Sequence, residues 1–353
     1  MQNFVYDQLP YRVVFGAGAF DRIADEADRL GLSKLLVLST PGQAHLSEEA
    51  GRRLGARVAA LYPHARMHVP VETAEAARAE ARRLGSDGAV AIGGGSTIGL
   101  AKAIALESGV PIIAIPTTYA GSEMTPIYGL TEGGTKKTGR DMKVLPRAVV
   151  YDPQLTLGLP AKVSGPSGMN AIAHCVEALY AENANPVTSL MAEEGIRALA
   201  RSLPQIAADP GNRDARSDAL YGAWLGGISL GAVGMALHHK LCHTLGGSFN
   251  LPHAETHTIV LPHAVAYNSK AAPEAMKRIA VALGAKEAAS GLYELASAVS
   301  APLALKEIGL KEQDLDRASE IATRNPYYNP RAISREGIRR LLDDAFHGRR
   351  PAT

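Results

Sequence analysis

Six of the chain's eleven histidines lie within the stretch HHKLCHTLGGSFNLPHAETHTIVLPH, residues 238–263. Imidazole is a common ligand of transition metals, and it also donates hydrogen bonds and transfers protons near neutral pH. The same stretch contains one acid, Glu255, and no aspartate. A divalent cation bound here would therefore lack a carboxylate close by in the sequence. The histidines either bind a metal without that charge or serve another chemistry.

Two pairs of polar residues have the spacing that places both members on one face of a helix. Asn170 and His174 stand four residues apart in SGMNAIAHCVEALY, and so do His239 and His243 in HHKLCHTLGG. His253 follows a Gly-Gly turn, where a new helix is expected to begin. A lone helical histidine is usually a packing or surface residue. Two such pairs in otherwise apolar helices favour a functional site.

A glycine-rich turn occurs in AVAIGGGSTIGLAKAI, between an apolar strand and a helix. Its residues are Gly93, Gly94, Gly95 and Ser96. Glycines let the backbone approach a ligand closely, and a helix N-terminus offers N–H groups to an anion. We expect this turn to bind the pyrophosphate of a dinucleotide, although a tight strand-to-helix turn is the alternative. The pattern is neither G-x-G-x-x-G nor a Walker A loop.

A second turn, IPTTYAGSEMTP, follows the next strand and carries the hydroxyls of Thr117, Thr118 and Ser122. Ligands of open α/β folds bind where strands end, so these hydroxyls are candidate cofactor contacts, with capping of local backbone as the alternative. The first predicted strand ends in Ser39 and Thr40 rather than in an acid. An acid there would hold a ribose 2′-hydroxyl and repel a 2′-phosphate. Without one, we expect both NADH and NADPH to be tolerated, with Ser39 near the cofactor.

The elements that must position these residues fall into two halves. Apolar runs at 34–40, 66–71, 88–96 and 111–118 read as strands separated by helical patterns, which predicts a parallel sheet covered by helices. Residues 124–130 and 141–153 resemble a hairpin and a last strand. After Pro153 the patterns are helical. We expect a dinucleotide-binding α/β domain over residues 1–153 and an all-α domain over residues 154–353.

The composition is that of an ordinary globular protein, with 46% hydrophobic and 20% charged residues among 353. A formal charge of +2 gives no reason to expect nucleic acid or a membrane as partner. No run of about 18 apolar residues and no secretory signal pattern is evident. The two cysteines, Cys175 and Cys242, are therefore expected to be reduced thiols in a cytoplasmic protein.

Several motifs in order resemble the iron-containing (group III) alcohol dehydrogenases. They are FGAGAF, GGGSTIGLAKAIA, IPTTYAGSEMTPIYG, LPRAVVYDP, SGMNAIAHCVEALY and HHKLCHTLGGSFNLPHAETH with LPHAVAYN. The variants GGGSTIGLAKA, PTTYAGSE and MNAIAH are similar to the maleylacetate reductase branch. The resemblance implies a Rossmann-like N-terminal domain and a helical C-terminal domain, in the architecture shared with dehydroquinate synthase. It also implies catalysis in the cleft between them and a homodimer.

The departures from the family pattern concern charge. Metal-dependent relatives bind a divalent ion with an aspartate and three histidines, which fall here on Asn170, His174, His239 and His253. Asn170 replaces the one anionic ligand, and Gly99 stands where the alcohol dehydrogenases usually carry an aspartate. A neutral ligand set should bind a divalent ion weakly. We expect no required metal, and instead a dicarboxylate substrate that brings its own negative charge.

The resemblance thus predicts the NADH- or NADPH-dependent reduction of the carbon–carbon double bond of maleylacetate to 3-oxoadipate, in aromatic-compound degradation. His243 is the leading proton or hydrogen-bond donor, and His174, His239, His253 and Asn170 would line the substrate oxygens. Lys137 is a further candidate for the cleft, with a solvated loop lysine as the alternative. Tyr327 and Arg331, in the loop 324–331, are candidates for contact with a substrate carboxylate, with a structural turn as the alternative. Glu177 and Glu182 are expected to form solvated or capping contacts.

Three other functions compete with this one. A metal-dependent alcohol or polyol dehydrogenase would use the surviving histidines. A lyase of the dehydroquinate synthase type would share the architecture, but the missing acidic ligand counts against it. A non-catalytic nucleotide-binding module would leave the helical pairs unexplained.

Overall fold

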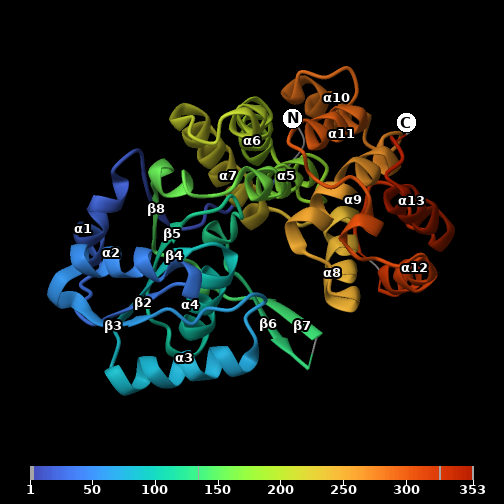
Figure 1. Cartoon of the computed structure of the whole chain (residues 1–353). Helices are drawn as coiled ribbons and strands as arrows, with labels where there is room; N and C mark the ends of the chain where they lie inside the picture. Colours follow the sequence, from blue (N-terminus) through green and yellow to red (C-terminus); the bar gives the residue numbers. More distant parts are fainter. Residues whose placement is uncertain (1–3, 134, 326, 352–353) are drawn as a thin grey trace. The chain divides into compact units, whose positions relative to one another are not determined.

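The computed structural model describes residues 4–133, 135–325 and 327–351. It divides the chain into two compact units (Figure 1). Leu9–Leu159 form an α/β unit, and the chain from Pro160 onward, with the residues before Leu9, forms a helical unit. The division predicted from the sequence, at residue 153, lies slightly earlier.

The α/β unit is built on a six-stranded sheet in which every neighbouring pair is parallel, so the parallel sheet predicted from the sequence is confirmed. Side chains alternate between its two faces, and each face is covered by helices. In sheet order the strands are β1 (Arg12–Phe15), β8 (Ala148–Tyr151), β5 (Ile112–Pro116), β4 (Gly88–Gly93), β2 (Leu35–Leu38) and β3 (Val58–Tyr62).

Two helices, α1 (Ile23–Arg29) and α2 (Ala44–Leu54), pack on one face of the sheet, where Ile23 and Leu54 are fully buried against strand residues such as Val37 and Ile92. The helices α3 (Val71–Leu84) and α4 (Gly95–Ser108) pack against each other, and α4 also contacts β4 and β5. The α4 helix is apolar on most of its surface because it is buried on several sides, and it begins at the glycine-rich turn.

One predicted strand is wrong. Residues 66–70 contain a turn and one isolated β-bridge, from Pro70 to Thr131, and Val71 already begins α3, so the strand in this region is β3, Val58–Tyr62. His68 and Val69 have φ values of 64° and 48°, in the left-handed region that no strand contains. Their carbonyl groups accept hydrogen bonds from the Oγ1 and the backbone N–H of Thr131, at 2.8 and 3.1 Å. Tertiary anchoring therefore overrides the β-rich composition of this segment.

The hairpin predicted from residue 124 onward is present as β6 (Ile127–Glu132) and β7 (Thr135–Arg140), which pair antiparallel outside the main sheet. Its second strand lies in the polar segment TKKTGR rather than in the apolar run that follows. That apolar run ends in β8, the last strand that the sequence predicted.

The helical unit confirms the all-α prediction for the second half of the chain. A core of buried side chains joins its later helices, with Leu241, Val260, Leu315 and Leu342 at 0% exposure. The helices are α5 (Ala161–Ala178), α6 (Pro186–Ala208), α7 (Arg213–Ala232), α8 (Leu237–Phe249), α9 (His253–Asn268), α10 (Pro273–Leu283), α11 (Ala288–Ala298), α12 (Leu315–Thr323) and α13 (Arg335–His347).

Two predictions from the sequence concern these helices: that both cysteines are reduced, and that no apolar run is long enough to span a membrane. Cys175 and Cys242 are both free thiols, and both are buried. Among the residues that the structure describes, no single helix has the length and apolar composition to cross a membrane. The pair α7 and α8 meets those criteria only when taken together, and it is bent by 95°.

Candidate active site

The two turns predicted to bind the cofactor lie side by side in the α/β unit. Gly93, the last residue of β4, is paired with Pro116, the last residue of β5. Gly94 caps α4, and a Cβ built on it would lie 3.0 Å from the Cγ2 of Thr118. The first N–H groups of α4 have no preceding helical turn to bond, so they are available to an anion at this edge of the sheet.

Glycine at position 93 has a steric cause of its own. Its φ is 150°, and a Cβ there would lie 2.5 Å from the Thr97 hydroxyl oxygen and 3.0 Å from Gln43 Oε1. The sequence therefore needs glycine here whether or not a ligand binds. Close approach to a phosphate is an additional role that stays a prediction for Gly93, Gly94, Gly95 and Ser96.

Three of the four hydroxyls predicted to contact the cofactor have partners inside the protein. The Ser39 hydroxyl is buried and donates to Ser47 Oγ at 3.1 Å. Thr117 Oγ1 accepts a hydrogen bond from Gln43 Nε2 at 2.9 Å, and Ser122 Oγ lies 3.3 Å from Lys102 Nζ. These contacts are with side chains elsewhere in the unit, so they differ from the predicted alternative of capping local backbone. The partly exposed Thr118, beside Gly94, is the hydroxyl best placed for a ligand.

A buried lysine that the sequence patterns did not single out organises the second turn. Lys102 Nζ donates to the carbonyl oxygens of Ser122, Thr125 and Ile127 at 2.6, 2.8 and 2.7 Å. Burial lowers the pKa of Lys102 to about 7, but three carbonyl acceptors match the three N–H donors of an ammonium group. Lys102 thus ties the turn to α4. A single lysine in the apolar helix GSTIGLAKAIALES was the available signal.

A second missed group is Glu123, which is fully buried next to Lys102. The Tyr151 hydroxyl donates to Glu123 Oε1 at 2.7 Å, and burial raises the pKa of the Glu123 carboxyl. The attraction of Lys102 opposes that rise. The polar residues behind the turn therefore form one connected network that holds the backbone of residues 122–127 in place.

Gly99, where the resemblance implies an aspartate in the alcohol dehydrogenases, lies close to Val69. A Cβ at Gly99 would lie 2.8 Å from Val69 Cγ2, closer than carbon atoms pack. Val69 belongs to the segment with left-handed backbone that Thr131 anchors. An aspartate at position 99 would require that segment to move. Glycine at position 99 is therefore coupled to the conformation of residues 66–70.

In the helical unit, the structure brings the two predicted helical pairs together. The His174 ring on α5 stacks on the His239 ring on α8, with centroids 5.1 Å apart and planes inclined by 30°. The His243 ring lies 6.2 Å from that of His239. His253, at the start of α9, has its ring 4.2 Å from His257, which is 5.0 Å from His239.

Three polar atoms at the centre of this cluster have no hydrogen-bond partner within the described chain. They are Asn170 Oδ1, His174 Nδ1 and His239 Nε2. All three residues are buried, with exposures of 3, 3 and 6%. Burial, followed by the nearby His239, His253 and His243, lowers the pKa of His174 well below its ordinary value. Buried polar atoms without partners indicate a place where a ligand's polar groups bind.

The acid that the histidine stretch lacks comes from α5. Glu177 was expected to be solvated or capping, but it is fully buried, so a solvated role is wrong. Its carboxylate accepts the backbone N–H groups of Ala236 and His238 at 2.8 and 2.7 Å, which caps α8. It also contacts the ring Nδ1 of His239 at 2.8 Å. The i,i+3 spacing from His174 to Glu177 on an apolar helix was the signal that both share one helix face.

The donor set can be tested against the metal that the resemblance implies. Asn170 contributes an amide oxygen, and His174, His239 and His253 contribute imidazoles, so every donor is neutral. Both oxygens of Glu177 are occupied by N–H groups of α8 and His239. The carboxylate therefore does not replace the aspartate ligand. The three imidazoles are metal-ligand types, but the donor set lacks the anionic ligand that the resemblance gives to the metal-dependent relatives.

A second group of metal-ligand types lies behind the first. Ligand atoms of His238, Cys242 and His257 lie within 4.8 Å of one another, and all three residues are buried. His238 Nε2 is 3.0 Å from His257 Nδ1, a hydrogen bond between two neutral rings. Burial is the largest cause that lowers the pKa of both histidines. The contact between His238 and His257 belongs to the packing of α8 on α9, and His238 Nδ1 and His257 Nε2 are buried without a hydrogen-bond partner among the described residues.

Lys137 and Tyr327 differ in their surroundings. Lys137 lies on β7 of the α/β unit with its side chain 71% exposed, and it pairs with Glu132 at 2.5 Å. Tyr327 is partly buried beside the core of the helical unit, and its hydroxyl has no partner within the described residues. Burial and the nearby Glu177 raise its pKa. Tyr327 therefore lies near the histidine cluster, whereas Lys137 has the contacts of a solvated lysine.

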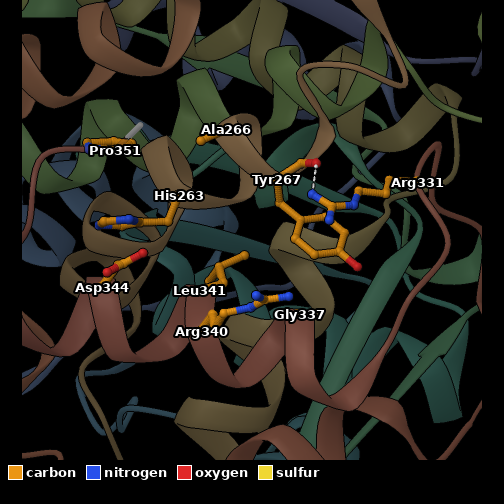
Figure 2. A pocket seen from close by; sticks show the side chains of 9 residues that line it. All are labelled: His263, Ala266, Tyr267, Arg331, Gly337, Arg340, Leu341, Asp344 and Pro351. Atoms are coloured by element: carbon orange, nitrogen blue, oxygen red, sulfur yellow. Dashed lines mark hydrogen bonds between the residues drawn. The ribbon is translucent and has the colours of Figure 1, made fainter. Parts of the chain in front are cut away.

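Arg331 is separated from the histidine cluster by most of the length of α9. Figure 2 shows its guanidinium over the ring of Tyr267, at 4.1 Å, where it donates to the Tyr267 carbonyl oxygen at 3.1 Å. Tyr267 is near the end of α9 and His253 at its start, about 20 Å apart at 1.5 Å per residue. A six-carbon substrate cannot contact both ends. The pocket that Arg331 lines also contains His263, Arg340 and Asp344.

The α/β unit and the helical unit each match a known family. Residues 10–153 match the iron-containing alcohol dehydrogenase model, and residues 165–346 match the C-terminal model of the Fe-containing alcohol dehydrogenase family. The maleylacetate reductases of Burkholderia cepacia and Sphingobium indicum are 57 and 58% identical to the chain, over 100 and 99% of both lengths. The crystal structure of maleylacetate reductase from Rhizobium sp. strain MTP-10005 covers 99% of the chain and 100% of its own, with 52% identity and a TM-score of 0.96. With both halves of the chain matched, it belongs to the iron-containing alcohol dehydrogenase family.

Proposed function

We propose that this chain is a maleylacetate reductase that uses a nicotinamide cofactor. Its reaction converts maleylacetate, reduced cofactor and one proton to 3-oxoadipate and oxidised cofactor. The observation that carries the proposal is the full-length match of the chain to maleylacetate reductases. The resemblance implies that Asn170, one helical turn before the buried His174, stands where metal-dependent relatives have an anionic ligand. The family supports an oxidoreductase with a nicotinamide cofactor.

The reaction needs stabilisation of charge on one oxygen. The bound cofactor would supply a hydride, which adds to the alkene carbon distal to the ketone and leaves an enolate on the ketone oxygen. Donors aimed at that oxygen stabilise the transition state more than the ground state. The unpartnered nitrogens of His174 and His239 are suitable donors when protonated. A general acid, for which His243 is the candidate, then protonates the carbon next to the ketone.

The electrostatics of the cluster favour an anionic substrate. Its ligand-facing groups are imidazoles and one amide, which do not repel carboxylates, and the substrate carries two negative charges. A metal-dependent alcohol dehydrogenase would instead need an anionic ligand at position 170. The alternative functions are therefore not favoured, and no metal is part of the proposed mechanism.

Several finer points belong to the same proposal. Both NADH and NADPH are accepted, because β2 is followed by Ser39 and Thr40 and not by an acid. The enzyme acts in aromatic-compound degradation, in the cytoplasm, as a homodimer. Its partner is a small dicarboxylate rather than nucleic acid or a membrane.

The absorbance of the reduced cofactor at 340 nm tests the proposal. Purified protein is mixed with maleylacetate and NADH or NADPH, with and without a strong chelator. Rapid loss of absorbance that the chelator does not affect supports the proposal. Activity confined to simple alcohols with oxidised cofactor and added divalent metal would select the alcohol dehydrogenase instead.

A further inference from the structure

We infer that Glu177 is a positioning residue for the reaction: it places the proton of His239 on Nδ1 and aims Nε2 at the substrate. The inference rests on the proposed function for its catalytic consequence, but its structural part stands on the contacts of Glu177 alone. Glu177 is on α5 and His239 is in the first turn of α8, so one side chain links two helices of the cluster.

The geometry determines which ring nitrogen carries the proton. Glu177 Oε1 accepts the His238 backbone N–H at 2.7 Å, and Oε2 accepts that of Ala236 at 2.8 Å. Both oxygens thus serve as acceptors, as in an ionised carboxylate. Oε2 also lies 2.8 Å from His239 Nδ1. A carboxylate has no hydrogen to donate, so Nδ1 must donate to it.

The proton on Nδ1 sets the chemistry of the other nitrogen. In neutral imidazole only one nitrogen carries hydrogen, so His239 Nε2 presents a lone pair, and after taking up a proton it presents an N–H donor. Nε2 is buried and has no partner among the described residues, and Asn170 Oδ1 and His174 Nδ1 share that condition. Nε2 is therefore the nitrogen of His239 that remains for the substrate.

The carboxylate also changes the electrostatics of the cluster. His239 stacks on His174, and the Glu177 carboxylate contacts Nδ1 of His239 at 2.8 Å. Glu177 thereby distinguishes His239 from His174, for which no carboxylate contact is present in the described structure. The carboxylate–histidine arrangement resembles those that orient imidazoles in metal sites and in hydrolytic triads.

A role limited to capping α8 predicts different behaviour, so the two can be separated. Capping depends on the backbone N–H groups of Ala236 and His238 and is indifferent to the side chain at position 239. Positioning acts through the His239 ring and disappears when that ring is removed.

The first test uses the unaltered protein. Long-range ¹H–¹⁵N correlation spectra of protein labelled with ¹⁵N-histidine report which nitrogens of each ring are protonated, and a His239→Gln variant assigns the signals. We expect His239 to be protonated at Nδ1. A neutral His239 protonated only at Nε2 would overturn the inference, whatever the enzyme's substrate is.

The second test is a double-variant cycle with maleylacetate. Glu177→Gln should lower kcat about 10- to 100-fold, the usual effect of removing a residue that orients a functional histidine. The dissociation constant for NADH should stay within about twofold, because the glycine turn belongs to the α/β unit. Glu182→Gln, which changes an exposed acid just beyond α5, is the matched control.

The cycle is completed in the His239→Gln background. There, Glu177→Gln should lower kcat by less than about twofold. An equal loss in both backgrounds would show that Glu177 only caps α8, and the inference would be wrong. If the unaltered enzyme does not reduce maleylacetate, the proposed function fails while the spectra still decide the position of the proton.

Discussion

The imidazoles of His174 and His239 stack with centroids 5.1 Å apart, although one ring comes from α5 and the other from α8. Asn170 precedes His174 by about one helical turn and is equally buried. The residue at position 170 therefore sets the charge about one helical turn from His174 on α5. A neutral amide favours an anionic substrate, and a carboxylate would favour a cation.

Replacing Asn170 with aspartate should convert this group toward a metal site. Two unit charges about 4 Å apart interact by about 4 kcal/mol at an effective dielectric of 20. The variant should gain affinity for Zn²⁺ or Fe²⁺, because the new carboxylate attracts the cation. It should lose efficiency on maleylacetate, because the same carboxylate repels the substrate's carboxylates. Metal analysis and steady-state kinetics of Asn170→Asp measure both effects.

Asn183→Asp is the control for that substitution, since it adds the same charge at an exposed position of the helical unit. Asn183→Asp should change neither the affinity for metal nor the efficiency on maleylacetate. If the unaltered protein already holds stoichiometric metal and loses activity on chelation, the histidine cluster is a metal site and its proposed role in binding an anion is wrong.

His243→Ala tests the proposed proton donor. His243 is more exposed than His174 and His239, and its ring lies 6.2 Å from that of His239. Loss of one donor to a developing charge typically lowers the rate by about 10²–10³-fold. We expect kcat on maleylacetate to fall by about that factor while NADH affinity changes little. His347→Ala on α13 is the control, and a His243→Ala variant with most of its turnover would exclude the catalytic role.

Gly94→Val tests the predicted pyrophosphate site. The φ of Gly94 is −86°, which valine adopts, but its Cβ would lie 3.0 Å from Thr118 Cγ2. The side chain should occupy the edge where α4 offers its N–H groups, and calorimetry should show NADH affinity lowered at least tenfold. Gly158→Val is the control, because no atom lies within 4 Å of the Cβ position there. Unchanged affinity in Gly94→Val would place the cofactor elsewhere.

Lys102→Met should weaken both the α/β unit and its cofactor site. The carbonyl oxygens of Ser122, Thr125 and Ile127 would lose their shared donor, and each unsatisfied buried group costs about 1–3 kcal/mol. We expect the free energy of unfolding to fall by about 3 kcal/mol or more, measured by urea titration. NADH affinity should fall as well, since the same turn carries Thr117 and Thr118. Lys143→Met, at an exposed lysine, should leave both quantities near their original values.

His263 should make the helical unit sensitive to acid. Burial lowers its pKa to about 4 from an ordinary value of 6.5. Between those pH values the unfolded chain binds a proton that the folded chain does not, so stability is lost as the pH falls from 6.5 toward 4. The free energy of unfolding should fall by up to about 1.4 kcal/mol per pH unit, and by about 3 kcal/mol over the whole interval.

His263→Gln should remove that share of the pH dependence, whatever its effect on stability at pH 7.5. Trp224, the chain's one tryptophan, lies on α7 and reports unfolding of the helical unit by fluorescence. Urea midpoints at pH 5 and pH 7.5 should differ less in His263→Gln than in the original protein. An identical difference in both would show that His263 titrates normally, and His347→Gln serves as the control.

The sequence by itself determined the fold class and the family, because those depend on local patterns. Apolar runs ending in glycine and threonine predicted β4, β5 and the turns after them, and helical spacing predicted the pairs Asn170–His174 and His239–His243. Such patterns locate a strand or helix along the chain when it is strongly apolar. The prediction of a strand at residues 66–71 was wrong because the backbone there is held by Thr131, more than sixty residues away in the sequence.

Only the tertiary structure decided where the charges lie. The spacing of Glu177 relates it to His174 on the same helix, but it does not indicate that the carboxylate is buried against the first turn of α8, 59 residues later in the sequence. The same holds for Lys102, whose five oxygen neighbours belong to a turn 20 to 25 residues away. Buried charges persist only where several groups from separate segments converge to satisfy them, and that convergence is a property of the folded chain.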